Sequence, residues 1–186
     1  MYSTIKSYLI GFWEIFFPVR CLGCEDEISN TQFPLCVYCR HQIPMTHYHL
    51  QTDHPMDRVF YGRVLIDSST ALCYFKKEGI VQKLIHQLKY NQQEKIGQFF
   101  GEWLGELIVE SHCFENIEIV IPVPLHTTRL RKRGYNQVNR FGKSVAYRLC
   151  VPFFENILIR KKNTQTLVMK SRQERWETLE NAFEIL

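Results

Sequence analysis

Apolar residues in the second half of the chain recur at the spacing of amphipathic helices. The first stripe predicts a helix that ends near Asn91 and consists of Ile80, Leu84, Ile85 and Leu88. The second stripe consists of Ile96, Phe99, Phe100, Trp103, Leu104, Leu107 and Ile108. A third helix is expected over residues 137–149. A short fourth helix should begin after Ser171, which forms a capping-box pattern with Glu174.

Three segments between these helices have the composition of β-strands. Residues 63–75 (RVLIDSSTALCYF) are expected to be extended. Residues 117–125 (IEIVIPVPL) are β-branched, with no polar alternation after Glu118, which is typical of a strand buried on both faces. Residues 153–160 (FFENILIR) form a third candidate. Because strands alternate with helices, the pattern predicts an α/β domain with a parallel sheet over residues 58–186.

Residues 1–57 lack this regularity and are expected to form a separate unit. At its start, a helical stripe predicts a short amphipathic helix, made by Ile5, Leu9, Phe12, Trp13 and Phe16. This stretch is too short to span a bilayer, and no small-residue cleavage site follows it. We expect its apolar face to pack on the rest of the protein, with contact to a membrane surface as the alternative.

Two Cys-x-x-Cys pairs dominate the rest of this unit. Cys21 and Cys24 are separated by eleven residues from Cys36 and Cys39. A two-residue gap lets both thiolates reach one ion, and two such knuckles complete a tetrahedral sulfur site for structural Zn²⁺. A redox dithiol or buried thiols are the alternatives, and neither accounts for two pairs so close together. The ion would be the main element that folds this segment.

The remaining cysteines bear on the cellular compartment. Cys73, Cys113 and Cys150 stand singly in apolar surroundings, and the total of seven is odd. This usage fits a reducing cytosol better than a secreted disulfide scaffold.

The net charge of +4 is unevenly distributed along the chain. No acidic residue occurs between Glu118 and Glu155, where seven cations fall: Arg129, Arg131, Lys132, Arg133, Arg140, Lys143 and Arg148. A positive field of this kind favours the phosphates of a nucleotide or a nucleic acid.

The densest part of this field, RLRKRGYNQ at residues 129–137, follows the predicted buried strand. Open α/β folds bind ligands at the sheet edge where such a strand ends. The planar forks of Arg129, Arg131 and Arg133 suit phosphate oxygens, and an extended backbone would place the last two on one side. Gly134 permits a tight turn, and the next helix opens with N–H groups that attract anions. A phosphate site is therefore predicted, with a solvated surface loop as the alternative.

Five motifs together resemble the ComF family of competence proteins: FFPVRCLGC, LCVYCRHQIP, LIHQLKY, IPVPLHTTRLRKRGYNQ and SRQERWETLENAF. The resemblance covers nearly the whole chain. It implies a type I phosphoribosyltransferase-like fold with an N-terminal four-cysteine zinc module. It also implies a cytoplasmic location and a role in natural DNA uptake, where family members are thought to act with a competence helicase on incoming single-stranded DNA.

The resemblance also implies roles for individual residues. Cys21, Cys24, Cys36 and Cys39 match the zinc ligands. The phosphate- or pyrophosphate-binding positions are matched by Arg129, Arg131, Arg133, Gly134, Tyr135, Asn136 and Gln137 of the basic segment and by Lys89 in LKY.

The chain departs from the family pattern near its end. Family members continue after the NAF segment to a strand and an acidic, Thr- and Gly-rich loop that binds 5-phosphoribosyl-1-pyrophosphate (PRPP), with Mg²⁺ as its expected companion. Here no Asp follows Asp67, no Gly follows Gly142, and the sequence stops at Leu186. The domain over 58–186 is therefore expected to be truncated before the PRPP loop, so that this chain does not catalyse phosphoribosyl transfer.

Three functions stay open at this point. The first is a phosphoribosyltransferase-like protein that is active only when complete. The second is a zinc-containing module that binds single-stranded nucleic acid, for which Tyr135 and Phe141 are the aromatic residues inside the basic run. The third is a membrane-peripheral scaffold that uses the N-terminal helix.

Overall fold

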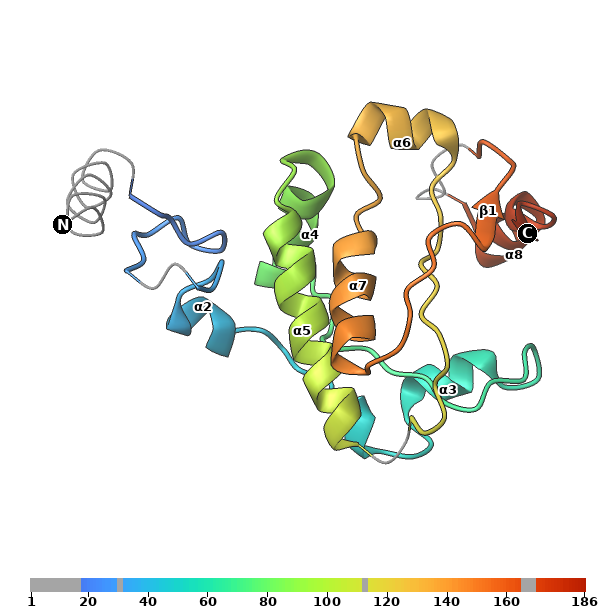
Figure 1. Cartoon of the computed structure of the whole chain (residues 1–186), viewed down its shortest axis with the longest axis horizontal. Coiled ribbons are helices and arrows are strands. Elements are labelled where there is room, and N and C mark those ends of the chain that lie inside the picture. The colour runs from blue at the N-terminus through green and yellow to red at the C-terminus, as the bar shows by residue number, and fades with distance from the viewer. Residues whose placement is uncertain (1–17, 30–31, 112–113, 165–169) are drawn as a thin grey trace.

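The computed structural model describes residues 18–29, 32–111, 114–164 and 170–186. The predicted N-terminal helix and Cys113 lie outside these ranges. The helices and strands, shown in Figure 1, are α2 (Val37–His41), η1 (Tyr48–Leu50), α3 (Pro55–Phe60), α4 (Ile80–Tyr90), α5 (Glu94–Glu110), α6 (Thr127–Arg133), α7 (Asn139–Arg148), β1 (Leu158–Arg160), α8 (Arg172–Leu179) and β2 (Phe183–Ile185). Among the described helices, none is both long and apolar enough to cross a membrane.

The helices follow the hydrophobic pattern closely. The predicted end of the first helix near Asn91 is confirmed, since α4 ends at Tyr90 with Asn91 as its C-cap. At the start of α8, the capping box is also confirmed. The Glu174 amide donates to Ser171 Oγ (3.3 Å), and the Ser171 amide donates to Glu174 Oε2 (2.6 Å).

Helices α5 and α7 pack side by side and form the centre of the molecule (Figure 1). Gly97, Gly101 and Gly105 recur every four residues along α5, so they share one face of the helix. A Cβ atom at Gly101 would lie 2.3 Å from the Phe141 carbonyl oxygen, and one at Gly105 would lie 2.7 Å from Arg148 Cβ. The two backbones approach this closely because α5 has no side chains at these positions.

The expected parallel sheet differs from what the described residues form. Their only regular sheet has two strands, with β1 antiparallel to β2 and Ile159 opposite Glu184. Residues 117–125 form no regular strand and pair at a single parallel bridge between Val120 and Phe153, where the Val120 amide donates to Pro152 O (3.0 Å). Residues 63–75 form no strand and contribute one antiparallel bridge, Met45 to Cys73. The described fold is therefore a mainly helical module with a small sheet.

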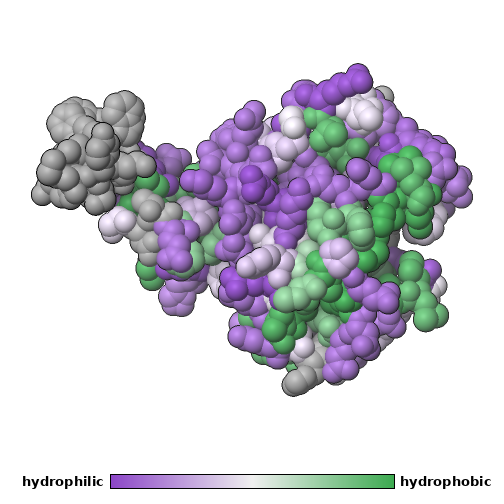
Figure 2. Space-filling model, viewed as in Figure 1, coloured by the Kyte–Doolittle hydropathy of each residue, from purple (hydrophilic) through white to green (hydrophobic). Residues whose placement is uncertain are grey.

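The prediction that residues 117–125 are buried on both faces is wrong in this structure. Ile119, Ile121 and Val123 are 41%, 36% and 61% exposed, because no described strand or helix covers their outer side. Figure 2 shows hydrophobic residues across this part of the face, below the strongly hydrophilic surface of α6.

One hydrophobic core joins the cysteine-containing unit to the helices. It includes Cys21, Leu35, Cys39 and Ile43 from that unit together with Leu84, Ile96, Phe99, Phe100 and Val145 from α4, α5 and α7. The Phe33 and Phe99 rings meet edge to face, with centroids 6.2 Å apart, and the Gln87 side chain donates to Leu22 O (2.9 Å). The division into residues 1–57 and 58–186 stays a prediction, and the core is continuous across it.

Candidate functional site

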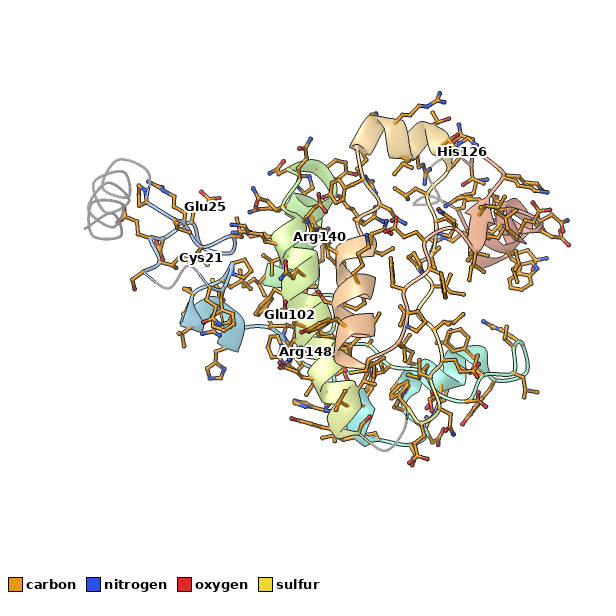
Figure 3. The ribbon with its side chains drawn as sticks, in the orientation of Figure 1. Cys21, Glu25, Glu102, His126, Arg140 and Arg148 are labelled. Carbon is orange, nitrogen blue, oxygen red and sulfur yellow. The ribbon has the colours of Figure 1, made fainter. Side chains whose placement is uncertain are left out.

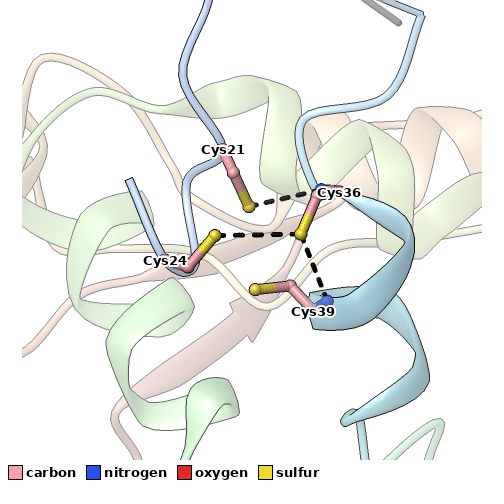
Figure 4. A group of neighbouring side chains, drawn as sticks. All are labelled: Cys21, Cys24, Cys36 and Cys39. Carbon is pink, nitrogen blue, oxygen red and sulfur yellow. Dashed lines mark hydrogen bonds between the residues drawn. The ribbon is translucent and has the colours of Figure 1, made fainter. Parts of the chain in front are cut away.

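The four paired cysteines converge as the spacing predicted (Figure 4). Their Sγ atoms all lie within 4.8 Å of one another, and Cys24 Sγ is 3.8 Å from Cys36 Sγ. Four sulfurs around a zinc ion at about 2.3 Å would be about 3.8 Å apart in a regular tetrahedron. All six cysteines in the described residues are free thiols, so no disulfide competes for this cluster.

Backbone amides surround the sulfurs of this cluster. Cys21 Sγ accepts from the amides of Gly23 (3.3 Å) and Cys36 (3.2 Å), and Cys36 Sγ accepts from the Cys39 amide at the start of α2. Burial raises the pKa of Cys21, but these backbone donors outweigh it and hold the pKa at about 6, below the usual 9.0. Burial and the neighbouring sulfurs raise the pKa of Cys39.

The cluster fits a closed structural site. Cys21 and Cys39 are 1% and 3% exposed, and all four ligands come from the protein, which leaves no open position for a substrate. A Cβ atom at Gly23 would lie 2.8 Å from Cys39 Sγ, so the first knuckle needs glycine at this position. The residues present suit a tetrahedral thiolate metal such as Zn²⁺.

The basic segment is a helix, and the expectation of an extended loop is wrong. Helix α6 (Thr127–Arg133) is capped at its start by His126, whose Nδ1 accepts from the Thr128 amide (3.2 Å), and at its end by Gly134, whose φ of 84° closes the last turn. Arg131, Lys132 and Arg133 occupy that last turn, where cations stabilise the exposed carbonyl groups. The density of cations therefore has a structural cause as well as a possible binding role.

The helix separates the three arginines of this segment. Arg131 and Arg133 point about 200° apart around the axis instead of sharing one side. Arg133 donates to Gln137 Oε1 and lies 5.8 Å from the Tyr90 ring centroid, whereas Arg129 donates to Thr164 O (2.7 Å). Arg131 is exposed. The structure therefore does not bring these three guanidinium groups to one point.

The residues after α6 fasten the segment to the rest of the molecule. The Tyr135 hydroxyl donates to Leu88 O, next to Lys89 in the last turn of α4. Asn136 is buried, donates to Val123 O (3.0 Å) and accepts from the Val138 amide. The structure thus brings Lys89 to the same corner as Arg133 and Tyr135, although the two parts are more than forty residues apart in sequence.

A cavity of about 810 Å³ lies beside this segment, between α6, the start of α7 and residues 155–160. Gly134, Tyr135 and Asn136 of the predicted site line it. The cations in its lining are Arg140, Lys143 and Arg160, whereas Arg129, Arg131 and Arg133 are not part of the lining. The motif therefore borders the cavity through its turn and not through its three arginines.

The cations of α7 are neutralised by acids from distant parts of the chain. Arg140 pairs with Glu94 (3.2 Å), Arg148 with Glu106 (2.9 Å) and Lys143 with Glu155. Figure 3 shows Arg140 and Arg148 along the α5–α7 pair, with Glu102 of α5 nearby. The acid-free stretch of the sequence is thus partly compensated in space, because α5 supplies two of the three carboxylates.

Two cavity residues were missed by reasoning from the sequence. Arg160 sits at the end of an apolar run, and Asn139 lies in the first turn of α7. The buried Arg160 Nε and Asn139 Oδ1 have no hydrogen-bond partner among the described residues. The one sequence signal that could have indicated Arg160 is its position at the end of a predicted strand.

Cys21 and His126, which caps α6, lie toward opposite ends of the molecule's long axis (Figure 3). The metal cluster is therefore remote from the cavity and does not contribute ligands to it.

Comparison with known proteins gives one match. Competence protein F of Haemophilus influenzae is 27% identical over 168 residues, which cover 89% of this chain and 69% of the relative. No family model and no solved structure matches the chain. The match and the four-cysteine cluster together confirm the resemblance carried by the motifs.

Proposed function

Because the chain belongs to the ComF family, we propose that it is a competence-associated protein that binds a phosphate-bearing ligand in the cavity beside α6. The carrying observation is the position of this cavity. The RGYNQ turn borders the cavity through Gly134, Tyr135 and Asn136, and Pro124 and Leu125 of the PVPLH segment that the family resemblance singles out also line it.

The lining of the cavity supports a ligand with both anionic and hydroxyl groups. Arg140, Lys143 and Arg160 supply positive charge, and Asn139 Oδ1 is a buried acceptor without a donor. A volume of about 810 Å³ exceeds what inorganic phosphate needs and is within the usual range for small-molecule sites. PRPP, with Mg²⁺, has this chemistry and is the ligand class that we propose.

The fold class that we propose is phosphoribosyltransferase-like. Residues 117–125 and 153–160 would be neighbouring parallel strands, and the parallel bridge between Val120 and Phe153 supports this proposal. We propose a cytoplasmic location on the family resemblance and the reduced cysteines.

The test is calorimetric titration of the zinc-loaded chain with PRPP and Mg²⁺. Binding is expected for the unmodified chain, and replacing Arg140 and Lys143, two cations of the cavity lining, together by Ala should weaken it strongly. Arg148→Ala is the matched control, because Arg148 pairs with Glu106 and is not part of the cavity lining. Failure of the unmodified chain to bind would contradict the proposal.

A second candidate function is binding of single-stranded DNA, together with a competence helicase, on the outer side of α6. Tyr90 is 65% exposed beside Arg133, and a base can stack on such a ring next to a cation. Tyr90→Ala should then weaken binding of a labelled oligothymidylate, whereas Tyr147→Ala, which removes a ring of α7 that is 80% exposed, should not. Equal effects of the two variants would count against this surface.

A further inference from the structure

A second cavity, of about 630 Å³, lies between η1, α3 and the loop of residues 61–69. This space, the α3 cavity, shares no lining residue with the cavity beside α6, and Figure 1 shows α3 and α6 toward opposite edges of the molecule. Its volume is within the usual range for small-molecule sites. The α3 cavity is therefore separate from the proposed ligand site.

Two of the three carboxylates that line the α3 cavity lack a Lys or Arg partner among the described residues. Asp53 pairs with Arg58 (3.2 Å), whereas Asp67 is exposed and takes part in none of the described ion pairs. The Asp57 carboxylate accepts from Ser69 Oγ (2.6 Å), which is a neutral donor. The charges of Asp57 and Asp67 are therefore left uncompensated by these contacts.

The lining holds one Lys or Arg side chain, Arg63, whose Nη1 donates to Val59 O (3.3 Å). Two carboxylates without a Lys or Arg partner thus stand against one guanidinium group. The lining keeps a net negative charge, and a ligand with a single positive charge would compensate it.

His54 adds a buried acceptor to this lining. Its side chain is 2% exposed, and its ring stacks on the Tyr48 ring with centroids 4.4 Å apart. Nε2 lies 2.8 Å from Ser69 O and 3.4 Å from Asp57 Oδ2, and because both are acceptors, Nε2 carries the ring hydrogen. Nδ1 of the neutral ring is then an acceptor, and it is buried without a partner among the described residues. A buried acceptor of this kind calls for a donor.

Apolar side chains complete the lining of the α3 cavity. Phe60, Val64 and Ile66 belong to it, and Tyr61 adds a ring that is 64% exposed. An apolar body can lie against these side chains while a charged end reaches the acceptors. The face of an aromatic ring also attracts an ammonium group nearby.

We propose that the α3 cavity binds a small organic ammonium ion, with its N–H groups toward Asp57, Asp67 and His54 and its apolar body against Phe60 and Val64. The unpaired carboxylates require the positive charge, and the free acceptor on His54 requires the N–H donors. This site goes beyond the proposed function and does not depend on it.

The experiment is calorimetric titration of the full zinc-loaded chain with phenethylamine, and with phenethyl alcohol as a neutral control of the same size. The ammonium should bind at least about 10-fold more tightly than the alcohol, because its hydrogen bonds to carboxylates are charge-assisted. The Asp57 side chain is 20% exposed, so Asp57→Asn should weaken binding about 10- to 100-fold. At the exposed Asp67, Asp67→Asn should weaken it about 2- to 5-fold.

Glu118→Gln is the matched control for Asp67→Asn. It also removes one negative charge from an exposed side chain, but Glu118 is not part of the cavity lining. The affinity for phenethylamine should therefore stay unchanged in this variant. Asp67→Asn should in turn leave PRPP binding unchanged, because Asp67 does not line the cavity beside α6.

A second measurement needs no substitution and stays informative if Asp57→Asn fails to fold. In nitrogen NMR spectra of the labelled chain, the Nδ1 resonance of His54 should move on titration with phenethylamine, since a donor reaches a nitrogen that had none. The Nδ1 resonance of His126 is the control and should not move, because it already accepts from the Thr128 amide and lies outside the α3 cavity.

Each outcome bears on the site directly. Equal affinities for phenethylamine and phenethyl alcohol, or no binding of the amine at all, would refute a site for an ammonium ion. Binding that is equally affected by Asp67→Asn and Glu118→Gln, or that leaves the His54 resonance in place, would show that the amine binds elsewhere. Loss of PRPP binding in the unmodified chain would overturn the proposed function and leave this site standing.

Discussion

The contact between α5 and α7 can be tested by adding a single methyl group. At Gly101, a Cβ atom would meet the Phe141 carbonyl oxygen at 2.3 Å and Phe141 Cα at 2.9 Å, both backbone atoms that cannot move without shifting α7. At Gly97, four residues earlier on the same face, the nearest atoms would lie at 3.5 Å, which is an ordinary contact. Gly97→Ala is therefore a matched control for Gly101→Ala.

The expected magnitudes follow from two opposing effects. Replacing a helix-interior Gly by Ala stabilises the helix by about 1 kcal/mol, and this gain is the same at both positions. Overpacking costs about 1–3 kcal/mol, and the rigid neighbours of Gly101 put it near the upper end of that range. We therefore expect Gly101→Ala to lower the free energy of unfolding by about 2 kcal/mol and Gly97→Ala to raise it by about 1 kcal/mol.

Urea denaturation of zinc-loaded protein measures both values. Gly105→Ala should fall between them, because the Cβ atom there would meet side-chain atoms of Arg148 at 2.7 and 2.9 Å. In thermal melts, the difference of about 3 kcal/mol corresponds to roughly 6–12 °C for a chain of this size. Equal effects of Gly97→Ala and Gly101→Ala would refute the close approach of α7 to α5.

Three further predictions concern the metal, the chemistry and the pH dependence. Purified protein should contain about one equivalent of zinc by elemental analysis. Cys36→Ser should lose the metal, whereas Cys150→Ser, which changes an exposed thiol outside the cluster, should keep it. The 186-residue chain should release no pyrophosphate from PRPP with any nucleobase of a panel. The reason is that both carboxylates in the described cavity lining, Glu94 and Glu155, already pair with cations. Detectable turnover would contradict this prediction. Burial lowers the pKa of His49 below its usual 6.5. Between the two pKa values, the imidazole therefore binds a proton in the unfolded chain but not in the folded chain. The contribution of neutral His49 to the free energy of unfolding is complete above pH 6.5 and is lost as the pH falls through the lower folded pKa. His49→Gln should therefore flatten that part of a curve of stability against pH.

The helices could be predicted from the sequence because their signals are local. The stripe of Ile80, Leu84 and Leu88 and the cap at Ser171 each lie within a few turns of one segment. Helix α6 was missed for a related reason. The segment was interpreted from its arginines and from Gly134, while the local signals for a helix, the His126 cap and the cations in the last turn, were given no weight.

The sheet and the contacts around Thr164 depend on residues that are distant in the sequence, which a single sequence does not reveal. The composition of residues 117–125 indicates extended backbone, but pairing needs a partner, and the described residues supply one bridge at Val120. Arg160 stands 31 positions after Arg129 and shares no motif with it. The two meet only because β1 and α6 both border Thr164.

The four cysteines could be predicted because the chemistry of one ion fixes their spacing, yet the sequence suggested a more independent unit than the structure has. Cys21 and Cys39 belong to the same buried core as Leu84 and Phe99, and Gly23 packs against Ile80 of α4. Removing zinc would therefore expose the apolar face of α4 and α5 as well as unfold the knuckles. Since α5 positions α7, and Arg140 of α7 lines the cavity, a loss of metal at one end of the molecule should reach the proposed ligand site through packing alone. Zinc chelation that leaves α4, α5 and PRPP binding intact would show instead that the cysteine unit folds independently of the rest.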